Sequence, residues 1–166
     1  MDAQNNQENN DLKLYTYHYK DHILDNGKIK EKETKDILSS TSWVITENNN
    51  VFLFDTSEEA TTFTEKANSV NTQKGRTRGS ISFSNINGFV GGRLLNFSNV
   101  TKANIPSSFD GTLRSFRFLS SSTSATAKVR FYNNLNLSGL IQVSRPSLFL
   151  ITQQVNSNTS SFEFRE

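Results

Sequence analysis

The chain has 166 residues, enough for one ordinary domain or two small ones, and a formal net charge of +2. Its 13 Phe and low net charge argue against disorder throughout, because a chain of this kind can bury an aromatic core. It contains no Cys, which excludes disulfides, thiolate metal sites and cysteine nucleophiles. No stretch is apolar enough to predict a membrane-spanning helix.

Residues 1–11 are almost all Asn, Gln and acidic residues, a composition that predicts a disordered tail. This segment lacks the basic and apolar regions of a signal peptide. It is typical of a tether that is exposed after processing of a bacterial protein. We therefore expect an extracellular or cell-surface location.

Residues 12–70 predict a small α+β domain, with elements in the order β-α-β-β-α. The expected elements are a strand at 12–19, a turn at 25–27, a helix at 30–40, a hairpin of strands 42–46 and 51–54, and a helix from 56 to about 68. Thr56 or Ser57 can cap the last helix, and Glu58 and Glu59 suit its N-terminal dipole. The polar residues 71–79, with their Lys and Arg, are interpreted as a solvated linker.

Residues 80–166 contain an internal repeat. The segment Ile81–Gly91 aligns without a gap on Val129–Gly139, and Asp110–Phe118 aligns on Asn156–Phe164. Both matches occur in the same order. We expect each copy to form four short antiparallel strands, and the two copies to pack as a sandwich.

Aromatic residues in the repeat alternate with polar ones, which predicts which side chains enter the core. We expect a buried position for Phe83 and Phe131 in the opening strands, and for the pairs at 116/118 and 162/164 in the closing strands. Gly91 and Gly139 occupy a place where a folded hairpin needs a positive φ angle or a close backbone approach.

This repeat resembles the Greek key of the βγ-crystallins. In that family a strand carries an aromatic residue, a second aromatic and a Gly follow at fixed spacing, and a Ser comes later in the closing strand. The corresponding residues are Ser84, Phe89, Gly91 and Ser115 in the first copy, and Tyr132, Leu137, Gly139 and Ser161 in the second. The resemblance implies an all-β sandwich of two Greek-key motifs for residues 80–166. Together with the elements expected at 12–70, the predicted fold is an α+β N-terminal subdomain followed by this sandwich.

Microbial members of this family carry a calcium signature just before the closing Ser. In the second copy the resemblance places this signature at Asn156–Ser161, with Ser157 in place of an Asn or Asp. It implies a weak calcium site, because such oxygen ligands suit calcium. The implied ligands are the side chain of Ser157, the Asn158 carbonyl, the Ser160 hydroxyl and the Asn85 carbonyl of the other copy.

The first copy carries a degenerate form of the signature, Asp110–Ser115. Gly111 removes a ligand, and Arg114 stands where a hydroxyl is required. A guanidinium remains protonated and can only donate hydrogen bonds. The second site, formed by Thr112, Arg114 and Asn133, is therefore expected to be empty.

The sequence has no signature of an enzyme. Its only histidines, His18 and His22, lie on a predicted strand and its turn, and no Ser stands in a Gly-x-Ser-x-Gly elbow. We expect a non-catalytic structural or binding protein without a nucleic-acid partner, and with an extracellular protein or glycan as its partner. A protease inhibitor of the same fold is the alternative, although inhibitors of this kind depend on disulfides and this chain has no Cys.

Overall fold

The computed structural model describes residues 15–20, 22–24, 32–73, 80–89, 91–118, 128–145 and 152–165. The predicted tail at 1–11 and the turn at 25–27 lie outside these residues. The described part is mostly β, with two sheets and two helices. It agrees with the predicted β-sandwich at this level.

The N-terminal part follows the expected β-α-β-β-α order with one strand added. Its elements are β1 (Thr16–Tyr19), β2 (His22–Leu24), α2 (Lys32–Ser40), β3 (Ser42–Thr46), β4 (Asn50–Phe54) and α3 (Ser57–Gln73). The added strand is β2, which pairs antiparallel with β1 before α2. The Thr56 hydroxyl accepts a hydrogen bond from the Glu59 amide at 3.2 Å and so caps α3. This helix extends past the expected end near 68 into the predicted linker, since no Gly or Pro occurs before Gly75.

The C-terminal part consists of strands and loops in its described residues. The first copy of the repeat contains β5 (Ile81–Ser84), β6 (Leu94–Ser98), β7 (Lys102–Asn104) and β8 (Ser115–Phe118). The second copy contains β9 (Lys128–Asn134), β10 (Ser138–Ser144), β11 (Gln153–Gln154) and β12 (Ser161–Arg165). Each copy therefore has the four strands that the sequence predicts.

The strands form an eight-stranded sheet in the order β11-β8-β5-β6-β3-β4-β1-β2 and a four-stranded sheet in the order β10-β9-β12-β7. In the larger sheet β3 pairs in parallel with β6, with Trp43 opposite Leu95. This sheet therefore continues across the predicted boundary between residues 12–70 and 80–166. That residues 80–166 fold alone stays a prediction.

The two repeat copies exchange their third strands. The third strand of the first copy, β7, pairs with β12 of the second copy, and β11 of the second copy pairs with β8 of the first. Equivalent backbone bonds hold the closing segments, from Arg114 N to Ser84 O and from Ser160 N to Tyr132 O, both at 2.8 Å. Each copy therefore contributes to both sheets.

The opening hairpins of the two copies share their local geometry. The closing serines donate equivalent bonds, from Ser115 Oγ to Ile86 O at 2.5 Å and from Ser161 Oγ to Asn134 O at 2.7 Å. Gly91 and Gly139 have φ angles of +84° and +77°, as their alignment predicts. The sequence alignment of the copies is therefore also a structural alignment.

The core lies between the two sheets and is aromatic. Phe83 is fully buried, and its ring centroid lies 5.9 Å from that of Phe131 and 5.6 Å from that of Phe162. Phe116 packs on Phe131 at 5.1 Å. The predicted inward positions of both opening and both closing strands are confirmed, since all these residues are buried.

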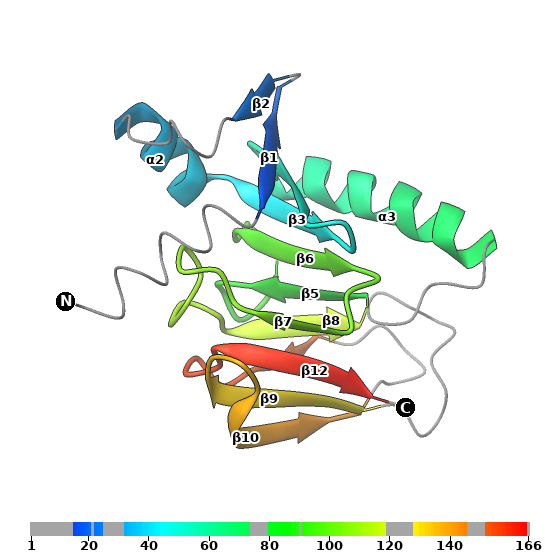
Figure 1. Cartoon of the computed structure of the whole chain (residues 1–166), viewed down its shortest axis with the longest axis vertical. Helices are drawn as coiled ribbons and strands as arrows, with labels where there is room; N and C mark the ends of the chain where they lie inside the picture. Colours follow the sequence, from blue (N-terminus) through cyan, green and yellow to red (C-terminus); the bar gives the residue numbers. More distant parts are fainter. Residues whose placement is uncertain are drawn as a thin grey trace.

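The outer face of the large sheet carries α3, which packs on β3, β4 and β6 (Figure 1). A buried polar chain links the helix to the sheet. Asn96 Nδ2 donates to Thr64 Oγ1 at 2.8 Å, and Ser82 Oγ donates to Asn96 Oδ1. Because these polar atoms are paired by hydrogen bonds, their burial beneath the helix leaves none of them without a partner.

Arg93 joins the N-terminal part to the repeat. Its guanidinium donates to Leu38 O at 2.8 Å, to Thr41 O at 2.9 Å and to Ser108 O at 3.3 Å, and stacks on Phe109 with Cζ 4.1 Å from the ring centroid. Burial lowers the pKa of Arg93 to about 10, so the side chain remains charged at neutral pH. The N–H groups of the guanidinium thus satisfy backbone carbonyls at the C-terminal end of α2.

Candidate functional site

An oxygen-rich surface pocket of about 370 Å³ lies where the closing loops of the two repeat copies meet. The lining residues are Asp110, Gly111, Asn133, Ser157, Asn158 and Ser160. Ser160 Oγ donates a hydrogen bond to Asp110 Oδ1 at 3.0 Å, so the two closing loops are in direct contact. The strand exchange explains this meeting, because it brings each closing loop beside the other copy. We call this site the oxygen pocket.

The oxygen pocket combines residues of the two calcium sites that the sequence implies. Ser157, Asn158 and Ser160 come from the weak site, and Asn133 comes from the degenerate one. Asn85 is not among the lining residues, and its Oδ1 instead accepts a hydrogen bond from Arg93 N at 2.8 Å. Asp110 adds the carboxylate that the expected ligand set lacks.

Arg114 and Thr112 do not line the oxygen pocket. The Arg114 guanidinium donates to Leu113 O at 2.9 Å and to Gly111 O at 3.3 Å, so it occupies carbonyls of its own loop. Thr112 Oγ1 donates to Phe109 O at 2.7 Å. Both side chains therefore bond within their own loop. That the site formed by Thr112, Arg114 and Asn133 is empty stays a prediction.

No cluster of three or more His, Cys, Asp or Glu side chains is found in the described residues. The oxygen pocket is of another kind, with one carboxylate among residues that carry amide and hydroxyl side chains. Calcium accepts all of these oxygen donors. The pocket can therefore attract a hard cation, with Asp110 as its only acidic lining residue.

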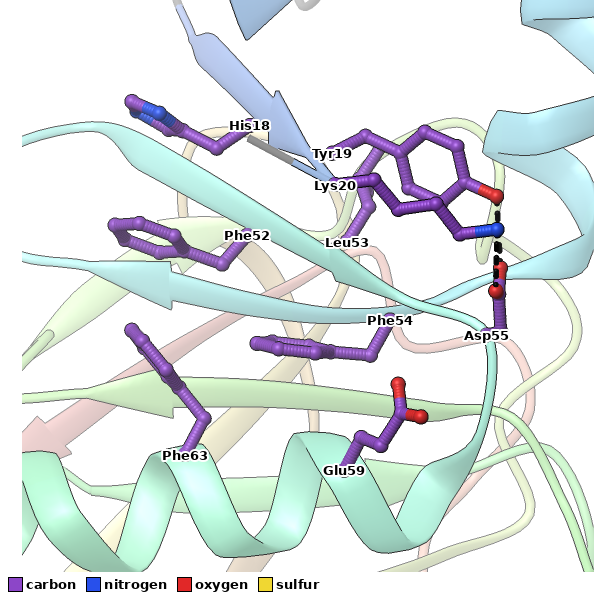
Figure 2. A pocket seen from close by; sticks show the side chains of 9 residues that line it. All are labelled: His18, Tyr19, Lys20, Phe52, Leu53, Phe54, Asp55, Glu59 and Phe63. Atoms are coloured by element: carbon purple, nitrogen blue, oxygen red, sulfur yellow. Dashed lines mark hydrogen bonds and ion pairs between the residues drawn. The ribbon is translucent and has the colours of Figure 1, made fainter. Parts of the chain in front are cut away.

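A second pocket, which we call the aromatic groove, lies on the outer face of the large sheet and has a volume of about 420 Å³ (Figure 2). It is lined by His18, Tyr19, Lys20, Phe52, Leu53, Phe54, Asp55, Glu59 and Phe63. Alternation along β4 explains the position of its aromatic residues, since Val51 and Leu53 are buried on the core side. Phe52 and Phe54 then project to the opposite face.

The rings of the aromatic groove form a contiguous row. His18 stacks on Phe52 with centroids 4.7 Å apart and an interplanar angle of 14°. Phe63 of α3 contacts Phe52 at 4.7 Å and Phe54 at 5.2 Å. Three elements, β1, β4 and α3, thus supply one aromatic wall.

Charged groups lie at one end of this row (Figure 2). Lys20 Nζ is 3.0 Å from Asp55 Oδ2, and Tyr19 Oη donates to Asp55 Oδ1 at 2.8 Å. The hydrogen bond from Lys20 and, to a smaller extent, the one from Tyr19 lower the pKa of Asp55. Asp55 therefore stays ionised and neutralises Lys20 at neutral pH.

The sequence did not predict the aromatic groove. The alternation of Phe52 and Phe54 in a predicted strand is a signal that could have indicated an aromatic face. In the sequence, the helix dipole is a sufficient explanation for Glu59, because its place beside the rings depends on how α3 crosses the sheet.

Comparison with protein-family models, with curated proteins and with solved structures finds no match for this chain. Within the described ranges, no helix is long and apolar enough to cross a membrane.

Proposed function

We propose that this chain is a non-catalytic binding protein in which residues 80–166 form a double Greek key of the βγ-crystallin type. The exchange of β7 and β11 between the two sheets supports this proposal, because it gives both copies the same arrangement of four strands. The equivalent bonds of Ser115 and Ser161 add support. The protein acts outside the cell, at the surface or after secretion.

Calcium is the ligand that we propose for the oxygen pocket. The observation that carries this proposal is the contact of Ser160 with Asp110, which unites a hydroxyl, a carboxylate and the nearby amides of Asn133 and Asn158. With one carboxylate, the affinity belongs to the weak extracellular range, with a dissociation constant of about 10⁻⁴–10⁻³ M. Such a site is occupied at millimolar calcium.

Calcium should raise the stability of the whole chain modestly. At a free concentration about 10 times the dissociation constant, mass action adds about 1.4 kcal/mol to the free energy of unfolding. For a chain of this size the melting temperature should rise by about 3–5 °C. Calorimetric titration and thermal melts with calcium, and with magnesium for comparison, measure both quantities.

Asp110→Asn should abolish this calcium response, since it removes the carboxylate and keeps the shape of the side chain. Asp36→Asn is the matched control, because Asp36 is exposed on α2 and does not line the oxygen pocket. A parent chain that shows no response to calcium, or an Asp110→Asn variant that keeps it, would contradict the calcium proposal.

Arg114→Ser should strengthen calcium binding. The change removes a fixed positive charge from the closing loop and frees the carbonyls of Gly111 and Leu113. We expect the dissociation constant to fall by about 3–10-fold, which corresponds to about 0.7–1.4 kcal/mol. Gly111 should be left unchanged, because its φ of +78° strains any residue with a Cβ. Equal or weaker binding by Arg114→Ser would show that Arg114 does not limit the site.

A further inference from the structure

We propose that the aromatic groove binds a small organic cation of the trimethylammonium type. The groove is separate from the oxygen pocket, since the two share no lining residue. The inference therefore goes beyond the proposed function and does not depend on it. Ring geometry, charge and size support it together.

Phe54 is half-buried and lines the groove at the end of the ring row nearest the charged groups (Figure 2). The ring of Phe52 contacts His18 on one side and Phe63 on the other, so these rings cover part of each other's surface. Within the described chain, the only ring that contacts Phe54 is Phe63. Phe54 therefore has one ring face that no other described ring covers. A cation within about 6 Å of such a face is attracted by the ring quadrupole.

The charges of the aromatic groove favour a cation over an anion or a neutral ligand. Lys20 and Asp55 neutralise each other across 3.0 Å. The remaining acidic group is Glu59, whose carboxylate pairs with no side chain among the described residues. Figure 2 shows Glu59 rising from the first turn of α3 toward Phe54 and Asp55. A negative charge thus lies in the groove on the side of Phe54.

The residues that line the groove indicate which kind of cation it can bind. A metal ion needs several oxygen ligands, and the groove offers mostly aromatic surface beside its two carboxylates. An alkylated ammonium ion suits a groove that contains both aromatic rings and a carboxylate. Its methyl groups pack on the rings, and its charge interacts with the ring quadrupole and with Glu59. The volume of about 420 Å³ lies within the range of small-molecule sites, about 300–1,000 Å³.

A titration of the whole chain with choline tests this proposal, with amide chemical shifts as the measurement of binding. The neutral control is 3,3-dimethylbutan-1-ol, which has the same shape without the charge. A cation–π contribution of about 1–2 kcal/mol predicts that choline binds about 5–30-fold more tightly than the alcohol. Shifts should centre on Phe54, Asp55 and Glu59. Equal binding of the two compounds, or binding only by neutral saccharides, would overturn the proposal.

Phosphocholine, as a further ligand, distinguishes two sources of the same group. Tighter binding of phosphocholine than of choline would indicate a lipid head group, and tighter binding of choline would indicate the free cation. Both results support the trimethylammonium assignment. Shifts with neither compound would overturn it.

Two neighbouring acids provide a matched pair of variants. Glu59→Gln should weaken choline binding about 5-fold or more, whereas Glu58→Gln should leave it unchanged, because Glu58 is in the same helical turn but does not line the groove. Phe54→Leu should also weaken binding, and thermal melts establish that each variant is folded. Asp110→Asn should bind choline as the parent does, which separates this proposal from the calcium site. Glu59→Gln binding at the parent's affinity would overturn the proposal.

Discussion

Phe83→Ala should lower the free energy of unfolding by about 3–5 kcal/mol, a large share of the stability of an ordinary domain. The side chain is fully buried, and its ring contacts those of Phe97, Phe116, Phe131 and Phe162 from both sheets. Truncation removes these contacts and leaves a cavity between the sheets. Chemical denaturation of the whole chain measures the loss.

Leu140→Ala is the control for this prediction. Leu140 lies on β10, and 52% of its surface is exposed, so its truncation should change the stability by no more than about 0.5 kcal/mol. If Phe83→Ala were as mild as Leu140→Ala, the aromatic layer would not be the core that joins the two sheets.

Arg93→Ala should cost about 3 kcal/mol. The substitution removes charged hydrogen bonds to three backbone carbonyls, and each such bond contributes about 1.5–3 kcal/mol, offset in part by the relief of burying a charge. The loss should loosen α2 and the start of β3 first, because Leu38 and Thr41 lose a partner there. Denaturation and hydrogen exchange of these amides measure both effects.

Arg93→Lys keeps the charge and should recover only part of the loss, because an ammonium lacks the planar fork that reaches several carbonyls. Arg145→Ala, at an exposed position, should be nearly neutral. Full recovery by Lys would mean that charge alone, and not the geometry of the fork, holds the end of α2.

The elements of the repeat could be predicted because its signals are local. Phe83 and Phe131 alternate with polar residues, and Gly91 and Gly139 occupy equivalent turns with positive φ. The same argument predicted the hairpin of β3 and β4 and the capped start of α3. Each of these features is specified by residues that are near one another in the chain.

The continuous sheet could not be predicted in this way. It depends on the parallel pairing of β3 with β6, and a parallel ladder leaves no turn signal between its strands. The polar residues after 70 therefore indicated a boundary that the sheet crosses. Residues 80–166 alone would expose the edge of β6 that β3 covers.

The oxygen pocket was predicted in part. Ser157, Asn158 and Ser160 follow from the signature in the second copy, whereas the sequence places Asp110 and Asn133 with the first-copy signature and its site. Their meeting depends on how the two closing loops cross after the strand exchange. No spacing within one copy contains that information.

The most direct test of the proposed function is a calcium titration of the whole chain followed residue by residue through amide chemical shifts. We predict weak, saturable shifts centred on Asp110, Gly111, Asn133 and the segment 157–160, with none at the aromatic groove. The shifts should disappear in Asp110→Asn. An absence of shifts at millimolar calcium, or shifts centred on Asp55 and Glu59, would contradict the proposal.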